Sequence, residues 1–258
     1  MRANLTLNRK EIAGRIAREL LALGVRPGGV LMVHSSLRAL GPDADPETVI
    51  QGLLQALGPS GTLLMPALSY KRVTADSPNF DVVETPSNVG AIPEYFRQRP
   101  GTERSLHPTH SVCGLGSRAA ELLGRHYLDR TPCGVNSPFH LLPEVGGQIL
   151  MLGCGLRPNT SMHALEEMVE PPYLFGQPLI YRLVEADGLT HEALYRQHGF
   201  SGWTQRYDRV EPLLDKPDLS RGAVLDAEAH LLEASGFWQA GLLMLRRDPL
   251  FFVEKDGD

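Results

Sequence analysis

A histidine and a glutamate spaced for acid–base chemistry stand in the segment NTSMHALEEMVE. Residues 159–161 are all of types that favour the start of a helix, so His163 is predicted in the first helical turn and Glu166 one turn later on the same face. The positive end of the helix disfavours a charged imidazole, and the carboxylate fixes which ring nitrogen carries the proton. A neutral histidine with one nitrogen held and the other available is what a general base requires. A structural His–Glu pair on a helix surface is the competing interpretation.

Two further histidine-containing motifs adjoin apolar runs of strand length. HSSL at 34–37 ends one such run, at the usual ligand edge of an open α/β sheet. Its hydroxyls and backbone N–H groups suit a phosphate or an oxyanion, although serines also gather in ordinary turns. HPTH at 107–110 offers two histidines, but Pro108 disfavours a helix and no third ligand stands close by, whereas a catalytic zinc needs three protein ligands. No metal is expected.

Other sequence signals point away from common enzyme classes. GLGSRA at 114–119 fits a dinucleotide-binding pattern, but the region about twenty positions on reads TPCGVNSPF, a loop instead of a second strand with an acidic residue. A tight strand-to-helix turn is therefore the favoured interpretation. The G-x-S-x-G motif of α/β-hydrolases is missing from the sequence. The three cysteines are widely spaced and form neither a disulfide framework nor a zinc knuckle.

The elements that must position these groups can be predicted from periodicity and capping. Residues 9–23 have apolar positions at helical spacing, and Asp45 caps a helix over 46–57 that begins with proline. That helix joins apolar strands within 28–37 and 61–68, which makes a βαβ unit with parallel strands. Further along we expect helices over 92–101, 117–128, 159–170 and 225–234, strands over 109–116, 148–155 and 239–247, and a hairpin over 179–198 around Asp187-Gly188. The predicted fold is a single three-layer α/β/α domain over 1–258 with a mixed, largely parallel sheet.

The composition limits the classes of partner. The chain has 258 residues, 42% hydrophobic and 21% charged, with a formal net charge of −5. This argues against disorder, general nucleic-acid binding and attraction to an anionic membrane. The N-terminus lacks the apolar core of a signal peptide, and the sequence holds no apolar stretch long enough to cross a bilayer. We expect a cytoplasmic protein. Its oligomeric state is not determined by the sequence, and a homodimer is compatible with it.

Five segments together resemble one family. VHSSLRALG, GTLLMPALSY, FDVVETPSNVGAIPEYFRQRPGTERSLHPTHSVCGLG, GVNSPFHLL and LGCGLRPNTSMHALEE occur in that order. The combination resembles the aminoglycoside N3-acetyltransferase family, an antibiotic N-acetyltransferase group distinct from the GNAT superfamily. The GNAT phosphate loop is approached only by QRPGTE, whose last position does not fit. The resemblance is strongest up to residue 170 and weakens over 171–258, the portion expected to select the substrate.

The resemblance implies acetyl-CoA as co-substrate and an amine as acceptor, most specifically the 3-amino group of an aminoglycoside antibiotic, and hence antibiotic resistance. It also implies direct transfer, in which a histidine oriented by a carboxylate deprotonates the amine. The family's L-H-x-x-E falls on 162–166, with methionine in place of leucine, so His163 would be the base and Glu166 its partner. The implied CoA-binding residues are His34, Ser35, Ser36, Leu37, Arg104, Ser105, His107, Thr109 and Ser111. The implied substrate-binding residues are Glu167, Glu170, Asn136 and Ser137.

Two other functions stay open at this point. A metal-dependent hydrolase would use His107, His110, His163 and Glu166. A domain that binds CoA without turnover would retain the fold but not the chemistry. The intact His163–Glu166 pair favours the transferase.

Overall fold

Seven strands form the central sheet of the computed structural model, which describes residues 8–257. In spatial order they are β10 (Leu219–Val224), β11 (Ala227–Glu233), β6 (Gln148–Leu152), β1 (Val30–Ser35), β2 (Thr62–Pro66), β5 (Val112–Gly116) and β4 (Glu103–Arg104). Strand β1 pairs in parallel with β2 and β6, which confirms the βαβ unit, whereas the outer pairings are antiparallel. The sheet is thus mixed, as expected, but it is parallel only in its three central strands and not largely parallel, because the outer strands join by antiparallel pairing. Residues 1–7, part of the segment expected to lack a signal peptide, lie outside the described range.

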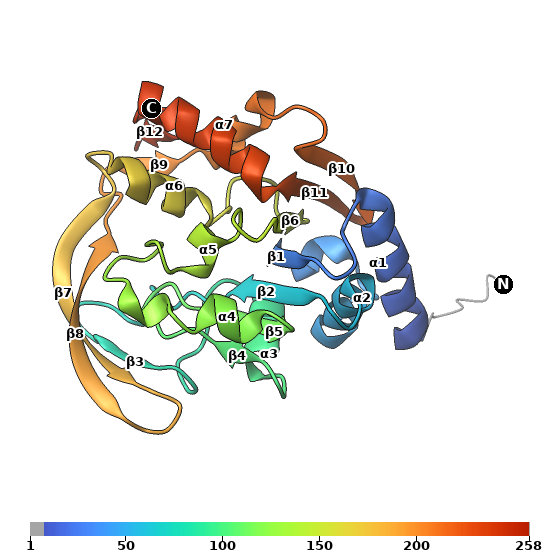
Figure 1. The fold of residues 1–258 in the computed structure, drawn as a ribbon, viewed down its shortest axis with the longest axis horizontal. Helices are drawn as coiled ribbons and strands as arrows, with labels where there is room; N and C mark the ends of the chain where they lie inside the picture. Colours follow the sequence, from blue (N-terminus) through green and yellow to red (C-terminus); the bar gives the residue numbers. More distant parts are fainter. Residues whose placement is uncertain (1–7, 258) are drawn as a thin grey trace.

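Helices cover both faces of this sheet (Figure 1). One face carries α1 (Arg9–Leu23), α2 (Pro46–Leu57) and α3 (Ala91–Gln98), and the other α4 (Ala119–Leu123), α5 (Pro138–Leu141), α6 (Met162–Val169) and α7 (Ala234–Arg247). Alternate residues of β1 serve the two layers: Leu31 and Val33 pack with α1 and α2, and Val30 and Met32 pack with α4 to α7. The three-layer α/β fold is therefore confirmed.

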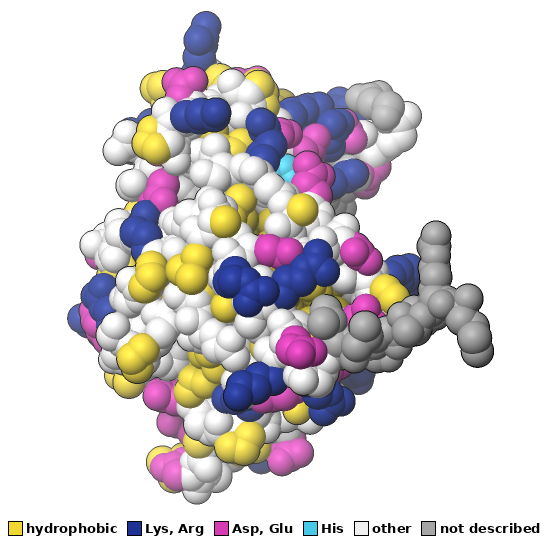
Figure 2. Space-filling view, turned by 90° about the vertical axis from the view of Figure 1, so that its right-hand side faces the viewer, with side chains coloured by type: hydrophobic (Ala, Val, Ile, Leu, Met, Phe, Trp, Pro, Cys, Tyr) yellow, Lys and Arg dark blue, Asp and Glu magenta, His cyan; other side chains and the backbone are white. Residues whose placement is uncertain are grey.

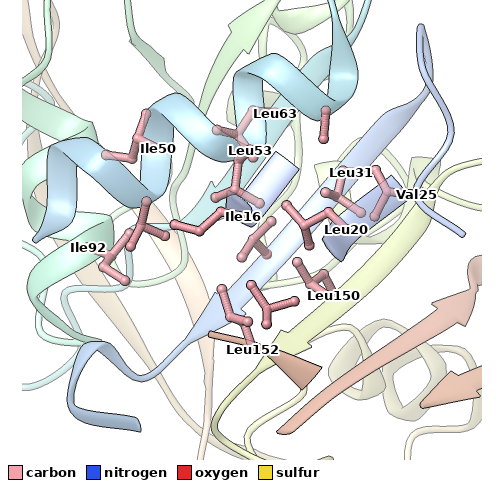
Figure 3. Packing of buried hydrophobic residues seen from close by; sticks show 14 of the residues in the cluster. Ile16, Leu20, Val25, Leu31, Ile50, Leu53, Leu63, Ile92, Leu150 and Leu152 are labelled. Carbon is pink, nitrogen blue, oxygen red and sulfur yellow. The ribbon is translucent and has the colours of Figure 1, made fainter. Parts of the chain in front are cut away.

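The core between the sheet and helices α1, α2 and α3 contains leucines and isoleucines from segments far apart in the sequence. Figure 3 shows Ile16 and Leu20 of α1 meeting Leu53 of α2 and Leu31 of β1, and all four are buried. Both helices begin at the expected residues. Asn8 and Glu11 form a reciprocal cap for α1, and the Asp45 side chain, as predicted, caps α2 by accepting from the Thr48 N–H. Figure 2 shows this side of the molecule, where acidic and basic side chains are interspersed instead of gathering in a basic patch.

A second, three-stranded sheet lies beside the first. The hairpin of β7 (Phe175–Val184) and β8 (Thr190–His198) is confirmed where the sequence predicts it, and β3 (Asn79–Asp81) pairs with β7. Figure 1 shows the hairpin curving along one side of the molecule. Two short strands, β9 (Trp203–Gln205) and β12 (Val253–Lys255), form a third sheet near the C-terminus. Between residues 8 and 257 the structure also has three short 3₁₀ helices: η1 (Leu37–Leu40), η2 (His126–Leu128) and η3 (Tyr207–Leu213).

Two predictions for the C-terminal part are wrong. Residues 225–234, expected as a helix, contain strand β11, because pairing with β6 and β10 overrides the helix propensity of its alanines, leucines and glutamates. Residues 239–247, expected as a strand, belong to α7, whose buried face includes Phe237, Gly241 and Leu245 at helical spacing. The helix expected over 117–128 is also shorter, because it ends after Leu123 and a separate 3₁₀ turn follows Gly124.

The described range 8–257 contains no helix that is both long and apolar enough to span a membrane.

The contact between α1 and α2 depends on Gly52. A Cβ placed there would stand 2.5 Å from Ile16 Cγ2, with the α1 backbone just beyond. We expect Gly52→Ala to lower the free energy of unfolding by about 1–3 kcal/mol, because an added methyl group forces the two helices apart. Gly14→Ala in α1 is the matched control: its Cβ meets only the Arg18 side chain at 3.6 Å, so helix propensity should raise stability by up to about 1 kcal/mol. Urea denaturation of both variants checks this, and equal effects would contradict it.

Candidate active site

A pocket of about 640 Å³ opens where the end of the β7–β8 hairpin meets the start of α6. It is lined by Leu68, Tyr70, Val89, His110, Cys154, Arg157, Pro158, Asn159, Thr160, His163, His198, Gly199, Phe200, Gln205 and Tyr207. Most of these residues lie in loops, and they come from segments between residues 68 and 207. The pocket therefore depends on the whole fold and on no single motif.

The predicted pair His163–Glu166 lies in the wall of this pocket. Helix α6 begins at Met162, so His163 is in its first turn as expected. The turn before it is held by Asn159, whose Oδ1 accepts from the Ser161 N–H at 3.1 Å. His163 exposes 13% of its side chain and Glu166 is fully buried. The His163 Nδ1 lies 2.9 Å from Glu166 Oε2, which places the ring proton on Nδ1 and leaves Nε2 as the basic nitrogen.

Two tyrosine hydroxyls complete the surroundings of the buried carboxylate. Tyr173 donates to Glu166 Oε1 and Tyr207 donates to Oε2, each at 2.8 Å, and the Tyr207 oxygen also lies 2.9 Å from His163 Nδ1. Burial and the carboxylate raise the pKa of both tyrosines, so their hydroxyls stay protonated and remain donors. Sequence reasoning missed both residues. They stand beyond residue 170, where the resemblance to the family is reduced to fragments such as YDRVEPLL, which begins at Tyr207.

A second histidine–glutamate pair lies beside the first. His198 Nε2 is 2.8 Å from Glu167 Oε1, which also accepts from the Cys133 N–H at 2.7 Å. Burial raises the pKa of Glu167 to about 7 and lowers the pKa of His198 well below its usual value, with nearby His163 adding to the latter shift. The two imidazole rings, His163 and His198, have centroids 4.7 Å apart. Glu167, predicted to bind substrate, is thus the partner of a pocket-lining histidine.

Residues 104–111 form a hydrogen-bonded segment that supports the wall of the pocket. His107 Nδ1 accepts the backbone N–H groups of Thr109 and His110, and its ring stacks on His126 with centroids 4.9 Å apart. Arg104 donates to Ser111 Oγ and to backbone carbonyls of three other residues. Burial lowers the pKa of His107 well below its usual value and that of Arg104 to about 10.

Of the predicted CoA-binding residues in this segment, Thr109 lines a pocket, one of about 130 Å³ that shares Tyr70, His110 and His198 with the larger one. Ser105 bonds to His126 Nδ1 and accepts from the Val112 N–H, which makes it part of the supporting hydrogen-bonded segment. Contact of Arg104, Ser105, His107 and Ser111 with CoA stays a prediction.

The HSSL segment, residues 34–37, lies next to the large pocket. His34 and Ser35 line a small pocket of about 130 Å³ that shares Val89, Cys154, Pro158 and Thr160 with the larger one. His34 Nε2 and Ser35 Oγ are buried without a hydrogen-bond partner among residues 8–257. Burial, with His163 adding to it, lowers the pKa of His34 to about 3.

Ser36 and Leu37 lie at the start of η1, where the Ser36 N–H donates to the Leu152 carbonyl. Neither residue is among those that line the two connected pockets within the described chain.

The remaining predicted substrate residues stand apart from the pocket lining. Ser137 is buried and caps α5, and the Asn136 amide donates to Asp129. Glu170 is exposed at the end of α6 and pairs with Arg196 at 3.3 Å. Their contact with a substrate stays a prediction that these positions do not favour.

Comparisons with known proteins agree on one family. The family profile described as aminoglycoside 3-N-acetyltransferase matches residues 32–246. Aminoglycoside N(3)-acetyltransferase IV from Salmonella sp is 34% identical over 239 residues, which cover 91% of this chain and 87% of that protein. The solved structure of a histidine-to-alanine mutant of aminoglycoside acetyltransferase AAC(3)-IVa in complex with a gentamicin has a TM-score of 0.80 at 32% identity, covering 98% of this chain and 93% of that one. AAC-IIIb in binary complex with CoASH has a TM-score of 0.79 at 27% identity, covering 93% and 97%.

The three donors around Glu166 generate a stability prediction. Tyr207→Phe and Tyr173→Phe each deprive a buried carboxylate oxygen of a donor, so each should lower the free energy of unfolding by about 1–3 kcal/mol. Tyr127→Phe, at a half-exposed tyrosine, should change it by less than about 0.5 kcal/mol. Chemical denaturation measures all three, and the network is refuted if the two buried positions behave like Tyr127.

Proposed function

The chain belongs to the aminoglycoside 3-N-acetyltransferase family, and on that premise we propose that it transfers the acetyl group of acetyl-CoA to the 3-amino group of an aminoglycoside. The observation that carries the proposal is the His163–Glu166 pair, buried on the Glu166 side and bordering the pocket on the His163 side. A transferase of this kind needs a base at a pocket that both substrates can reach, and His163 lies in the wall of the pocket of about 640 Å³.

The proposed chemistry is a direct transfer. At neutral pH the substrate amine is an ammonium ion and cannot attack, so the Nε2 of His163 takes its proton while the amine nitrogen bonds to the thioester carbonyl carbon. The carbon–sulfur bond then breaks, and the departing CoA thiolate takes the second proton that the nitrogen loses as it becomes an amide. The products are the amide and CoASH, and the imidazolium passes its proton to water. Glu166 stabilises the imidazolium that forms, and the two tyrosine hydroxyls hold the carboxylate in place.

A covalent cysteine intermediate is not required. Burial raises the pKa of Cys113 to about 12 and that of Cys154 to about 11, and it raises the pKa of Cys133 well above its usual value. All three are therefore protonated thiols at neutral pH, which are poor nucleophiles. This holds even for Cys154, which lines the pocket.

We place the thioester between the pocket of about 640 Å³ and the small pocket lined by His34 and Ser35, which share four lining residues. The CoASH complex of AAC-IIIb shows that a relative of the same fold binds the cofactor. In this chain the HSSL pocket adds the buried, unpartnered His34 Nε2 and Ser35 Oγ, as far as residues 8–257 are concerned. We place the acyl end of acetyl-CoA beside these two groups and the amine on the wider side, near His163.

Asn159 supplies a donor for the oxyanion in this arrangement. Its side chain lines the larger pocket, and its Nδ2 is buried with no hydrogen-bond partner in the described part of the chain. A buried amide donor costs free energy unless a substrate atom accepts from it. The negative charge that develops on the thioester oxygen is such an acceptor.

The alternative hydrolase finds less support. Of its four residues, His110 and His163 lie close together, with ring nitrogens within 4.8 Å, but the other two are engaged elsewhere. His107 Nδ1 accepts two backbone N–H groups, and Glu166 is bonded to two tyrosines and His163. The other alternative, a domain that binds CoA without turnover, is distinguished from the transferase by the activity measurement below.

The setting follows from the chemistry. We propose that the protein acts in the cytoplasm, where acetyl-CoA is available. We also propose a homodimer. Ile180 and Leu194 are paired across β7 and β8, and both are more than half exposed, so a second copy would bury apolar surface there. Sedimentation of the purified chain distinguishes monomer from dimer.

The transferase assignment predicts thiol release from acetyl-CoA that depends on the acceptor's 3-amino group. An Ellman-type assay with aminoglycosides that carry or lack this amine measures it. We expect His163→Ala to lower kcat by about 10²- to 10⁴-fold, because the base is lost, with acetyl-CoA still raising the melting temperature. Unchanged turnover in His163→Ala would contradict the proposed mechanism. If acetyl-CoA neither binds nor reacts, the proposed function is wrong.

The oxyanion role predicts a specific effect at Asn159. Asn159→Asp keeps the oxygen that accepts from Ser161 N–H but replaces the amide donor with a second carboxylate oxygen. We expect kcat to fall by about 10²- to 10³-fold with the KM for aminoglycoside little changed. A rise in KM with kcat unchanged would indicate a role in substrate binding instead.

A further inference from the structure

Three imidazoles converge in the pocket from distant parts of the chain. His110 precedes β5, His163 is in the first turn of α6 and His198 ends β8. One ring nitrogen from each lies within 4.8 Å of the other two, and all three side chains line the pocket. The general base accounts for only one of them.

The hydrogen bonds around the three rings share one pattern. His163 Nδ1 is bonded to Glu166, His198 Nε2 to Glu167 and His110 Nδ1 to the Thr109 hydroxyl, at 2.8–2.9 Å. Each ring thus has one nitrogen held by an oxygen and the other left for a further ligand. Histidines that bind metal ions are oriented in this way, by an oxygen acceptor on the nitrogen that faces away from the metal.

An unpartnered atom singles out the same place. His198 Nδ1 is buried and makes no hydrogen bond with any residue from 8 to 257, although Nε2 of the same ring is paired with Glu167. Its ring centroid is 4.7 Å from that of His163 and 5.2 Å from that of His110. A buried polar nitrogen of this kind is costly unless a ligand satisfies it.

We propose that His110, His163 and His198 form a binding site for a divalent transition metal of the zinc class, and that the metal inhibits the enzyme. Imidazole is a preferred ligand for such ions, and three protein ligands with one open position are a stable coordination set. Zinc–nitrogen bonds of about 2.0–2.1 Å set the nitrogens about 3.3 Å apart in a tetrahedral site, so the rings must move inward on binding. The metal occupies Nε2 of His163, and the base is then unable to accept a proton. The inhibition rests on the proposed function, whereas the binding does not.

Metal binding is tested with Co²⁺ and Zn²⁺ on the full-length chain. Tetrahedral Co²⁺ absorbs in the visible range, and calorimetry with Zn²⁺ gives the stoichiometry. We expect one ion per chain. The variants His198→Gln and His110→Gln should each weaken binding by at least about tenfold, and Glu167→Gln should weaken it about 10- to 100-fold by loosening His198.

His191→Gln is the matched control, because His191 is an exposed histidine on the same strand as His198 and pairs with Glu185. It should bind the metal as the wild type does. Thermal unfolding identifies any variant that fails to fold, and the two ligand variants test the site independently. Absence of stoichiometric binding in the wild type, or an equal loss in His191→Gln, overturns the site.

Inhibition is tested separately by thiol release. Zn²⁺ should abolish turnover of the wild type at the concentration that fills the site, and a chelator should restore it. Any turnover that remains in His198→Gln should need at least about tenfold more Zn²⁺ to be inhibited. If the ion binds with the expected spectrum but turnover is unaffected, inhibition is refuted while the site stands. If metal-free protein shows no turnover with any aminoglycoside, the proposed function has failed, and the Co²⁺ spectrum still decides the site.

Discussion

The buried carboxylate of Glu166 is the constraint on which the site depends. A charge fully removed from water is tolerated only when donors surround it, and here the donors come from three places: the same helix, the loop before β7 and the 3₁₀ helix η3. The carboxylate therefore attaches the C-terminal third of the chain to α6. That attachment brings Tyr207 and the end of β8 to the pocket, whose lining also includes Cys154, just beyond the end of β6.

How much of this site can be predicted from the sequence depends on how far apart in the chain the contacting residues are. The His163–Glu166 pair could be predicted because both residues lie on one helical turn, and the βαβ unit because its capping and apolar patterns are local. Tyr173 and Tyr207 could not, since each meets Glu166 only through the folded chain. The exchange of helix and strand at β11 and α7 has the same origin: Ala229 and Leu231 pair with β6, a strand far earlier in the sequence.

The predicted cofactor and substrate residues separate in a similar way. His34, Ser35 and Thr109 lie at pockets, whereas Ser105 and Arg104 bond to neighbouring backbone and side chains, and His107 Nδ1 accepts from the backbone. A motif that resembles a family pattern can therefore contain residues that shape a site from behind as well as residues that border it. Glu167 illustrates the point, because its carboxylate holds His198.

The β7–β8 hairpin separates two environments along one pair of strands. One end delivers His198 to the pocket, and the other is the turn at Asp187-Gly188, ten residues away and about 33 Å along an extended strand. Residues 186–190, which include the turn and its neighbours, are exposed to solvent. Additional residues there would lengthen a solvated tip without reaching the chemistry. The tip is accordingly a site for an affinity tag or a surface tether that leaves the entrance to the pocket unobstructed.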